Sequence, residues 1–347
     1  MFWGEESMKK FLAIFFVFFV FCIKNVNAQE IRIVHFSDVH IDTKSPDKKV
    51  RKFAKSLPMF EKAIDKANLL YPNIVVFSGD MVNKPIDSEF DIFLNAAKKL
   101  KAPFYPALGN HDVGVAGGLS KETIIAKLNA NCPWLKLDKP YYSVIKGDYI
   151  FIFMDGTNDK IVTAKGFFSE NELKFLDKTL SDNPDKKAII VHHFPPMPPY
   201  KSISHEISNK EDYFAVIDKN PNVVMVLSGH FHATKAVQRN DVLYITTPSM
   251  IEYPHAFRYL KINDNLGEIT IESRLFVNEE QNAMEDIDNP SAKIKIGEEG
   301  DNFFKIKLNK SFEQTKSDKN WRNTIIAKLK EIFNKIKLIC CNVFLHC

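Results

Sequence analysis

The chain of 347 residues has 45% hydrophobic and 26% charged residues, a composition that excludes a disordered chain and supplies ample apolar material for a core. Its formal net charge of +4 comes from lysines spread along the sequence, which gives no reason to expect a nucleic-acid partner. Its few cysteines are irregularly spaced, with Cys340, Cys341 and Cys347 crowded at the end, which excludes a regular disulfide framework.

Residues 1–28 are typical of a secretory signal peptide. Lys9 and Lys10 precede an apolar run over residues 11–23, and small residues follow up to Ala28. The run is shorter than the about 20 residues that a membrane span needs. We therefore expect cleavage after Ala28 and a secreted or periplasmic protein, with Met8 as an alternative start. An uncleaved membrane anchor is the alternative interpretation.

After Ala28, short apolar runs alternate with segments of helical pattern. Near-continuous apolar runs of this length predict strands that are buried on both faces, at 31–36, 73–78, 103–108, 149–154, 187–192 and 222–227. The helical segments between them lie at 52–70, 88–100, 120–129, 169–180 and 211–219. This alternation predicts an α/β layered fold. Further strand patterns from residue 242 onward predict a second sheet or the far edge of the first.

Residues 277–347 differ from the rest of the chain in composition and pattern. We predict that the main domain spans residues 29–276 and that the polar residues 277–322 form a loosely ordered linker. Residues 323–347 predict a basic amphipathic helix followed by a cysteine-containing tail. Such a helix would contact a membrane surface or dock on the main domain, and the pattern is compatible with both.

Polar clusters follow the predicted strands. The candidate site residues share this position at strand ends, and they are Asp38, His40, Asp80, Asn110, His111, Asp112, His192, His193, His230 and His232. Taken singly, each is more often a turn residue or a buried structural side chain than a functional one. In open α/β sheets, however, ligands bind at the carboxyl ends of the strands, so these distant residues are expected to converge.

Carboxylates, imidazoles and an amide together suit divalent ions such as Mn²⁺, Zn²⁺ and Fe²⁺. The set has more ligands than one catalytic ion needs if that ion is to keep one coordination position open. It suits two ions that share a bridging carboxylate, an arrangement that can hold a hydroxide and stabilise an in-line displacement at phosphorus.

The ordered set D-x-H, GD, GNHD, H and GHxH resembles the calcineurin-like metallophosphoesterase superfamily, over residues 31–275. The resemblance implies a four-layer αββα fold, with two central mixed β-sheets flanked by helices. It also implies two divalent metal ions (Mn, Zn or Fe) and hydrolysis of a phosphate ester by attack of a metal-bridging hydroxide.

The same resemblance implies a role for each motif residue. Those at the first metal would be Asp38, His40 and His232, and those at the second Asn110, His192 and His230, with Asp80 bridging both. His111 would lie beside the scissile phosphate, oriented by Asp112. Either His192 or His193 could be the ligand of the fourth motif, and we favour His192 because it directly ends the strand. His193 would then face the substrate, as would His255 in "SMIEYPHAF".

Two features narrow the expected branch. Purple acid phosphatases carry a tyrosine three residues after the bridging aspartate, where this chain has Asn83. The double histidine followed by prolines looks most like the cyclic-nucleotide and glycerophosphodiester phosphodiesterases. We therefore expect an exported phosphodiesterase that acts on a small-molecule phosphate ester and not on nucleic acid. The alternatives are a phosphomonoesterase or nucleotidase, and a non-catalytic scaffold, which would have no need for the complete ligand set.

Overall fold

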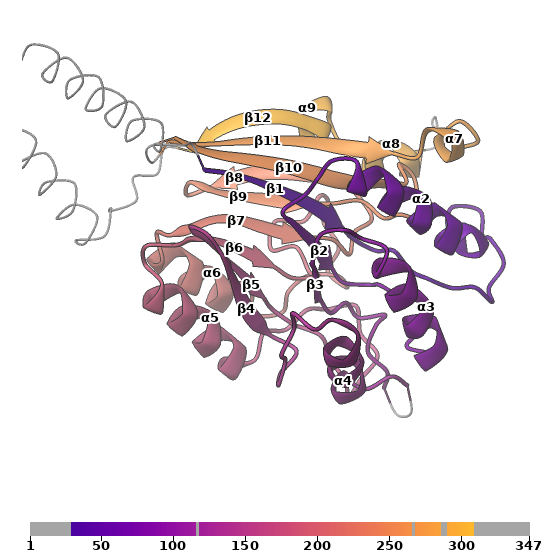
Figure 1. Ribbon diagram of the computed structural model, residues 1–347, viewed down its shortest axis with the longest axis horizontal. Coiled ribbons are helices and arrows are strands. Elements are labelled where there is room, and N and C mark those ends of the chain that lie inside the picture. Colours follow the sequence, from indigo (N-terminus) through magenta and orange to yellow (C-terminus); the bar gives the residue numbers. More distant parts are fainter. Residues whose placement is uncertain (1–28, 116–117, 266–267, 286–289, 309–347) are drawn as a thin grey trace, which may run out of the picture.

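The computed structural model describes residues 29–115, 118–265, 268–285 and 290–308, which form two six-stranded mixed sheets (Figure 1). The first sheet has the strand order β12 (Phe303–Leu308), β11 (Glu268–Val277), β10 (Ala256–Asn265), β1 (Gln29–Phe36), β2 (Ile74–Ser78) and β3 (Phe104–Ala107). The second has the order β4 (Tyr142–Lys146), β5 (Tyr149–Phe153), β6 (Lys187–Val191), β7 (Val223–Ser228), β9 (Val242–Thr246) and β8 (Lys235–Arg239).

Helices cover the outer face of each sheet, which confirms the expected four-layer fold (Figure 1). Helices α2 (Ser56–Asn68) and α3 (Asp87–Ala97) pack on the first sheet, and a short 3-10 turn, η1 (Phe53–Lys55), precedes α2. Helices α5 (Glu170–Asp182) and α6 (Lys210–Lys219) pack on the second. Helix α4 (Lys121–Asn131) adds Ile124 and Leu128 to the core of the first sheet.

Strand β5 shows why the central strands read as continuous apolar runs. Ile150 and Ile152 pack among the residues of α5 and α6, whereas Phe151 and Phe153 pack between the two sheets. Both faces of the strand are thus buried, because side chains alternate across a strand. A capping box begins α5, with Ser169 and Glu172 each accepting from the other's backbone N–H.

Phenylalanine rings join the first sheet to its helices. Phe36 and Phe77 on the sheet stack with their centroids 5.3 Å apart, and Phe60 of α2 lies 5.6 Å from Phe36. Phe93 of α3 contacts Phe77 edge-to-face at 5.2 Å. Aromatic pairs at these distances add to the burial of apolar area.

The prediction of a polar linker over residues 277–322 is wrong for its described part. Helices α7 (Glu279–Asn282), α8 (Pro290–Ile296) and α9 (Glu299–Asn302) lead into β12, which pairs antiparallel with β11. Strand β12 has the alternating sequence FFKIKL, in which Ile306 packs against the core. Residues 309–322, the predicted helix at 323–347 and the predicted signal at 1–28 lie outside the described residues. None of the described helices is long and apolar enough to cross a membrane.

Both ends of the described domain lie in one row of the first sheet. Gln29 of β1 pairs with Asp264, Asp264 pairs with Ile269, and Ile269 pairs with Leu308 of β12. This row lies at the opposite end of the sheet from the point where β1, β2 and β3 finish (Figure 1).

We expect Phe77→Ala to lower the free energy of unfolding by about 3–5 kcal/mol, because it removes a fully buried ring that contacts both helices. Urea denaturation followed by circular dichroism measures this. Phe303→Ala is the matched control, since its side chain is 64% exposed, and we expect a change within about 0.5 kcal/mol. Equal losses in the two variants would contradict this view of the core.

Candidate metal centre

The parallel strands of both sheets end on the same side, and their loops bring the predicted residues together. Asp38 and His40 follow β1, Asp80 follows β2, and the Gly109–Asp112 loop follows β3. From the second sheet, the double histidine follows β6 and the Gly229–His232 loop follows β7. The predicted convergence at the carboxyl ends of the strands is therefore found.

A first cluster consists of Asp38, His40, Asp80 and His232, all buried. His232 Nε2 lies 3.0 Å from His40 Nε2 and 3.3 Å from Asp38 Oδ1. His40 Nε2 lies 3.6 Å from Asp80 Oδ2. Four ligand atoms within 4.8 Å of one another could hold one divalent ion.

A second cluster consists of Asp80, His193 and His230. His193 Nε2 lies 3.2 Å from Asp80 Oδ2 and 3.0 Å from His230 Nδ1. Because Asp80 belongs to both clusters, its carboxylate lies where a ligand shared by two ions would lie.

The orphaned polar atoms of the site fit cations. Asn110 Oδ1 and His230 Nε2 are buried without a hydrogen-bond partner among the described residues. A buried polar atom without a partner costs about 1–3 kcal/mol, so such atoms imply a bound group. Two carboxylates, four imidazoles and an amide oxygen are donors that suit Mn²⁺, Zn²⁺ or Fe²⁺.

Two of the imidazoles are each held by a hydrogen bond at Nδ1, with Nε2 directed into the clusters. His193 Nδ1 lies 2.8 Å from the Ser78 carbonyl oxygen, and His232 Nδ1 lies 2.6 Å from Glu252 Oε2. Both partners only accept, so Nδ1 carries the proton and Nε2 is left for a metal. Although burial opposes a charge on His193, Asp80 raises the pKa of this imidazole to about 9, so metal binding there would release a proton.

The structure corrects the preference for His192. Its ring lies outside both clusters, with Nε2 2.9 Å from the Tyr213 hydroxyl of α6. The reason is the alternation along β6: Ile190 packs toward α5 and α6, and Val191 packs between the sheets. His192 follows the outward face and His193 the inward face, toward Asp80.

The structure also corrects the role expected of Asp112. His111 Nδ1 bonds to the Asn83 carbonyl oxygen at 2.7 Å, not to Asp112. The Asp112 carboxylate instead accepts from the backbone N–H groups of Met81, Val82 and Gly109 at 2.7–3.1 Å. It therefore ties the loop after β3 to the loop after β2. Burial and the nearby Asp80 raise the pKa of Asp112 to about 7.

His255 is not at the clusters. It is fully buried, with Nδ1 3.1 Å from the Met250 carbonyl oxygen and Nε2 3.4 Å from Glu285. The sequence singled it out as a substrate contact, but a side chain enclosed in this way supports the loop after β9.

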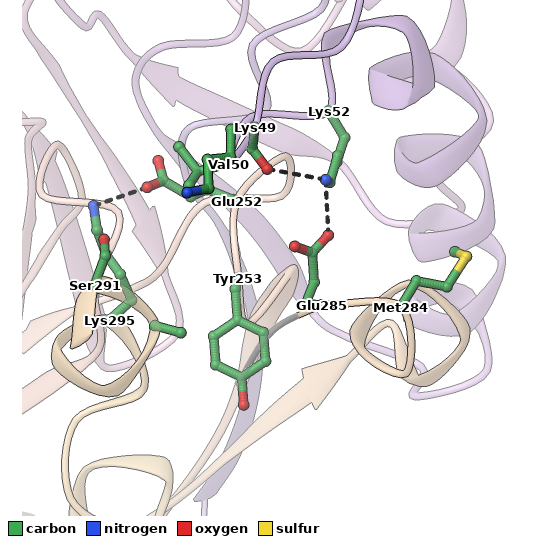
Figure 2. A pocket seen from close by; sticks show the side chains of 10 residues that line it. Lys49, Val50, Lys52, Glu252, Tyr253, Met284, Glu285, Ser291 and Lys295 are labelled. Carbon is green, nitrogen blue, oxygen red and sulfur yellow. Dashed lines mark hydrogen bonds and ion pairs between the residues drawn. The ribbon is translucent and has the colours of Figure 1, made fainter. Parts of the chain in front are cut away.

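Glu252 in that same loop was missed by sequence reasoning. It holds His232 and is paired with Arg51 at 3.4 Å. It is also paired with Lys295 of α8 at 3.4 Å (Figure 2). Lys295 also donates to the Phe231 carbonyl oxygen at 2.8 Å, between the two histidines of GHFH. The stretch predicted to be a linker thus supports the metal centre. Regular spacing offers no signal for either residue.

His205 also lies closer to the clusters than its sequence suggested. Its ring centroid is 5.1 Å from that of His230, and its Nδ1 lies 2.8 Å from the Ser202 hydroxyl. It is partly exposed and lies in the loop between β6 and α6.

The backbone at the site is held in an uncommon conformation. Asp38, His40, Asp80, His230 and His232 all have positive φ, between 48° and 70°. This left-handed region costs a non-glycine residue of order 1–3 kcal/mol and persists where the surroundings impose it. The backbone at Gly229 passes very close to Ser37 and Asp38. A Cβ there would be 1.7 Å from Ser37 Oγ and 2.4 Å from Asp38 Oδ2.

Comparison with known proteins agrees with this site. Residues 31–234 match the family model described as calcineurin-like phosphoesterase. The glycerophosphodiester phosphodiesterase GpdQ of Enterobacter lignolyticus is 26% identical over 225 residues, which cover 63% of this chain and 77% of that protein. A 3',5'-cyclic-nucleotide phosphodiesterase of Nostoc is 26% identical over 179 residues, covering 51% of this chain and 62% of that protein.

The fold also has counterparts among solved structures. The crystal structure of a dimetal phosphatase from Danio rerio superposes with a TM-score of 0.59 over 71% of this chain and 98% of that chain, at 15% identity. A purple acid phosphatase from yellow lupin superposes with a TM-score of 0.51 over 72% of this chain and 52% of that chain, at 16% identity. At these identities the likeness concerns the fold alone.

We expect Gly229→Ala to weaken metal binding at the first cluster by at least about tenfold, because the new Cβ displaces Ser37 and Asp38. Calorimetric titration of the metal-free protein with Mn²⁺ measures this. Gly300→Ala is the control, because a Cβ there meets nothing within 4 Å. Unchanged affinity in Gly229→Ala would show that the loop gives way without cost.

Proposed function

The chain belongs to the calcineurin-like phosphoesterase family, and from that premise we propose that it is a phosphodiesterase. Membership makes it a metal-dependent hydrolase of phosphate esters, with two divalent ions as its cofactors. The cluster pair that shares Asp80 is the observation that carries the proposal, because it provides the dinuclear site that such a displacement needs.

The choice of a diester rests on the relatives. Both the protein from Enterobacter and the protein from Nostoc are named as phosphodiesterases, and the first of them covers 63% of this chain. We propose the same class of substrate here, a small molecule with two ester bonds at one phosphorus.

Each ligand is assigned by its place in the two clusters. We assign Asp38, His40 and His232 to one ion, and His193, His230 and Asn110 to the other, with Asp80 shared. When bound, the ions would supply a nucleophile at neutral pH and neutralise charge on the phosphate oxygens. The protein's part is to hold these ligands in place, through the hydrogen bonds that the Nδ1–H groups of His193 and His232 donate to the Ser78 carbonyl oxygen and to Glu252.

His111 is the residue placed to act on the substrate. Its ring lies edge-on to His40, with centroids 4.9 Å apart, and it is only partly buried. Because the Asn83 carbonyl oxygen fixes the proton on Nδ1, Nε2 remains for the substrate. Its backbone N–H donates to Asp80 Oδ1 at 2.8 Å, which couples its position to the shared ligand. We propose that Nε2 contacts the phosphate or the leaving oxygen.

Export remains a proposal that rests on the sequence of residues 1–28 alone. We propose cleavage after Ala28, which places the enzyme outside the cytoplasm. N-terminal sequencing of the protein recovered from its native host tests this, and a retained N-terminus would contradict it. Membrane-surface contact through residues 323–347 rests in the same way on sequence.

We expect the metal-stripped protein, reconstituted with Mn²⁺, to hydrolyse bis-p-nitrophenyl phosphate faster than p-nitrophenyl phosphate. The protein kept in chelator is the control and should be inactive on both. The reverse preference would indicate a phosphomonoesterase or nucleotidase. Two bound ions without activity on either ester would favour a scaffold.

We expect His111→Ala to lower kcat by about 10²- to 10⁴-fold while two ions remain bound, because His111 contacts the substrate rather than a metal. Asp80→Ala is the contrasting variant, and we expect it to lose both ions and all activity. Elemental analysis beside the rate measurement separates the two. Metal loss in His111→Ala would contradict the assigned role.

A further inference from the structure

His35 is a buried histidine that the reaction does not use. It lies on β1, three residues before Asp38, and its side chain is fully enclosed. Neither of its nitrogens takes part in the two metal clusters. Both have partners, however: Nδ1 lies 2.9 Å from Thr247 Oγ1, and Nε2 lies 2.7 Å from Ser78 Oγ.

These contacts belong to a continuous chain of hydrogen bonds that ends on a metal ligand. Arg258 Nε donates to Thr247 Oγ1 at 3.3 Å, and Thr247 contacts His35. On the other side of His35, Ser78 Oγ donates to Ser37 Oγ at 2.8 Å, and Ser37 Oγ donates to Asp38 Oδ2 at 2.5 Å. All six residues are buried; His35, Ser78 and Arg258 lie on strands of the first sheet, and the others follow β1 or β9.

Only one direction of donation satisfies the chain. The Asp38 carboxylate is the acceptor at the end of the chain, because its Oδ2 receives both the Ser37 hydroxyl and the His230 backbone N–H, which can only donate. Ser37 donates its one hydroxyl proton to Asp38, so its oxygen accepts from Ser78. Ser78 has then used its own proton, and its oxygen accepts from His35 Nε2–H. A neutral His35 then accepts at Nδ1 from Thr247, whose oxygen accepts from Arg258, a group that can only donate.

His35 stays neutral for a physical reason. Burial and the charge of Arg258 lower its pKa to about 3. Three of the four other Arg258 N–H donors go to Ser273 Oγ, the Asp301 carbonyl oxygen and Thr234 Oγ1. The five hydrogen bonds from Arg258 to Asp38 thus run in one sense, and bonds aligned in this way polarise one another in a low-dielectric interior.

We propose that His35, protonated at Nε2, is a positioning residue that orients Asp38 for its metal ion through Ser78 and Ser37. Asp38 Oδ2 is occupied by Ser37 and by the His230 backbone N–H at 2.9 Å. Asp38 Oδ1 is therefore the oxygen left for the ion, and it is the one that has no hydrogen-bond partner among the described residues. The inference rests on the metal centre of the proposed function, not on the diester preference.

The tautomer of His35 is the first test. Nitrogen-15 spectra of the full-length, histidine-labelled, metal-free protein report which ring nitrogen carries the proton, and His35→Leu identifies its signals. We expect a neutral ring protonated at Nε2. A ring protonated at Nδ1 would reverse the chain and overturn the proposal.

Metal affinity of the full-length protein is the second test, measured by calorimetric titration with Mn²⁺. We expect Ser78→Ala to weaken one of the two sites by about tenfold and to leave the other unchanged. Thr247→Val, further along the chain, should weaken the same site less. His35→Gln, whose amide N–H can still donate to Ser78, should bind better than His35→Leu. Thr179→Val is the control, since Thr179 is a buried threonine of α5 outside the chain.

The outcomes separate positioning from mere stability, because thermal unfolding of the metal-free variants is recorded in parallel. Lower stability with both affinities unchanged would overturn the proposal, and so would equal weakening of both sites. Because no substrate is present, a failure of the diester preference leaves this result intact, and a change in affinity says nothing about which ester is cleaved.

Discussion

The carboxylate of Asp80 is the contact on which the rest of the site depends. It is shared by both imidazole clusters, and the Gly109 backbone approaches so closely that a Cβ there would lie 2.2 Å from Asp80 Oδ1. The His111 N–H donates to the same oxygen. One side chain from the loop after β2 therefore organises the loop after β3, the double histidine after β6 and the first cluster after β1. Burial makes this possible, because an ionised carboxylate away from water requires partners of opposite charge or N–H donors around it.

The surroundings of the metal ligands stabilise backbone conformations that are unfavourable in themselves. Asp38, His40 and Asp80 adopt left-handed backbone conformations, which Asp and His accept more readily than most residues do. The rigid sheets beneath them absorb this strain, since their strands are buried on both faces and their aromatic side chains interlock with the helices. Because the loops are tied together, as by Asp112, the ligands are held near one arrangement before any ion arrives.

Much of this was predictable from sequence, and the limits have physical causes. Near-continuous apolar runs indicated the strands, and the polar clusters behind them indicated Asp38, Asp80 and His230. The choice between His192 and His193 failed because it was made from distance to the strand end, whereas alternation from Ile190 and Val191 decides which face each takes. Glu252, Lys295 and Thr247 were beyond reach, since their contacts join segments far apart in the chain and follow no periodic pattern. Strand β12 was missed because it is a single short run with outward lysines at 305 and 307, inside a long polar stretch.

The row of paired residues from Gln29 to Leu308 has a consequence for how the domain meets its surroundings. Both points at which the described chain leaves the first sheet lie in one row, separated by β10 and β11, at the end of the sheet remote from Asp80. A segment attached at either point would therefore extend from the side of the domain opposite the metal centre. A tether at that end of the sheet would leave the metal centre on the opposite side. Anchoring of the domain and entry of dissolved small molecules would then use different surfaces.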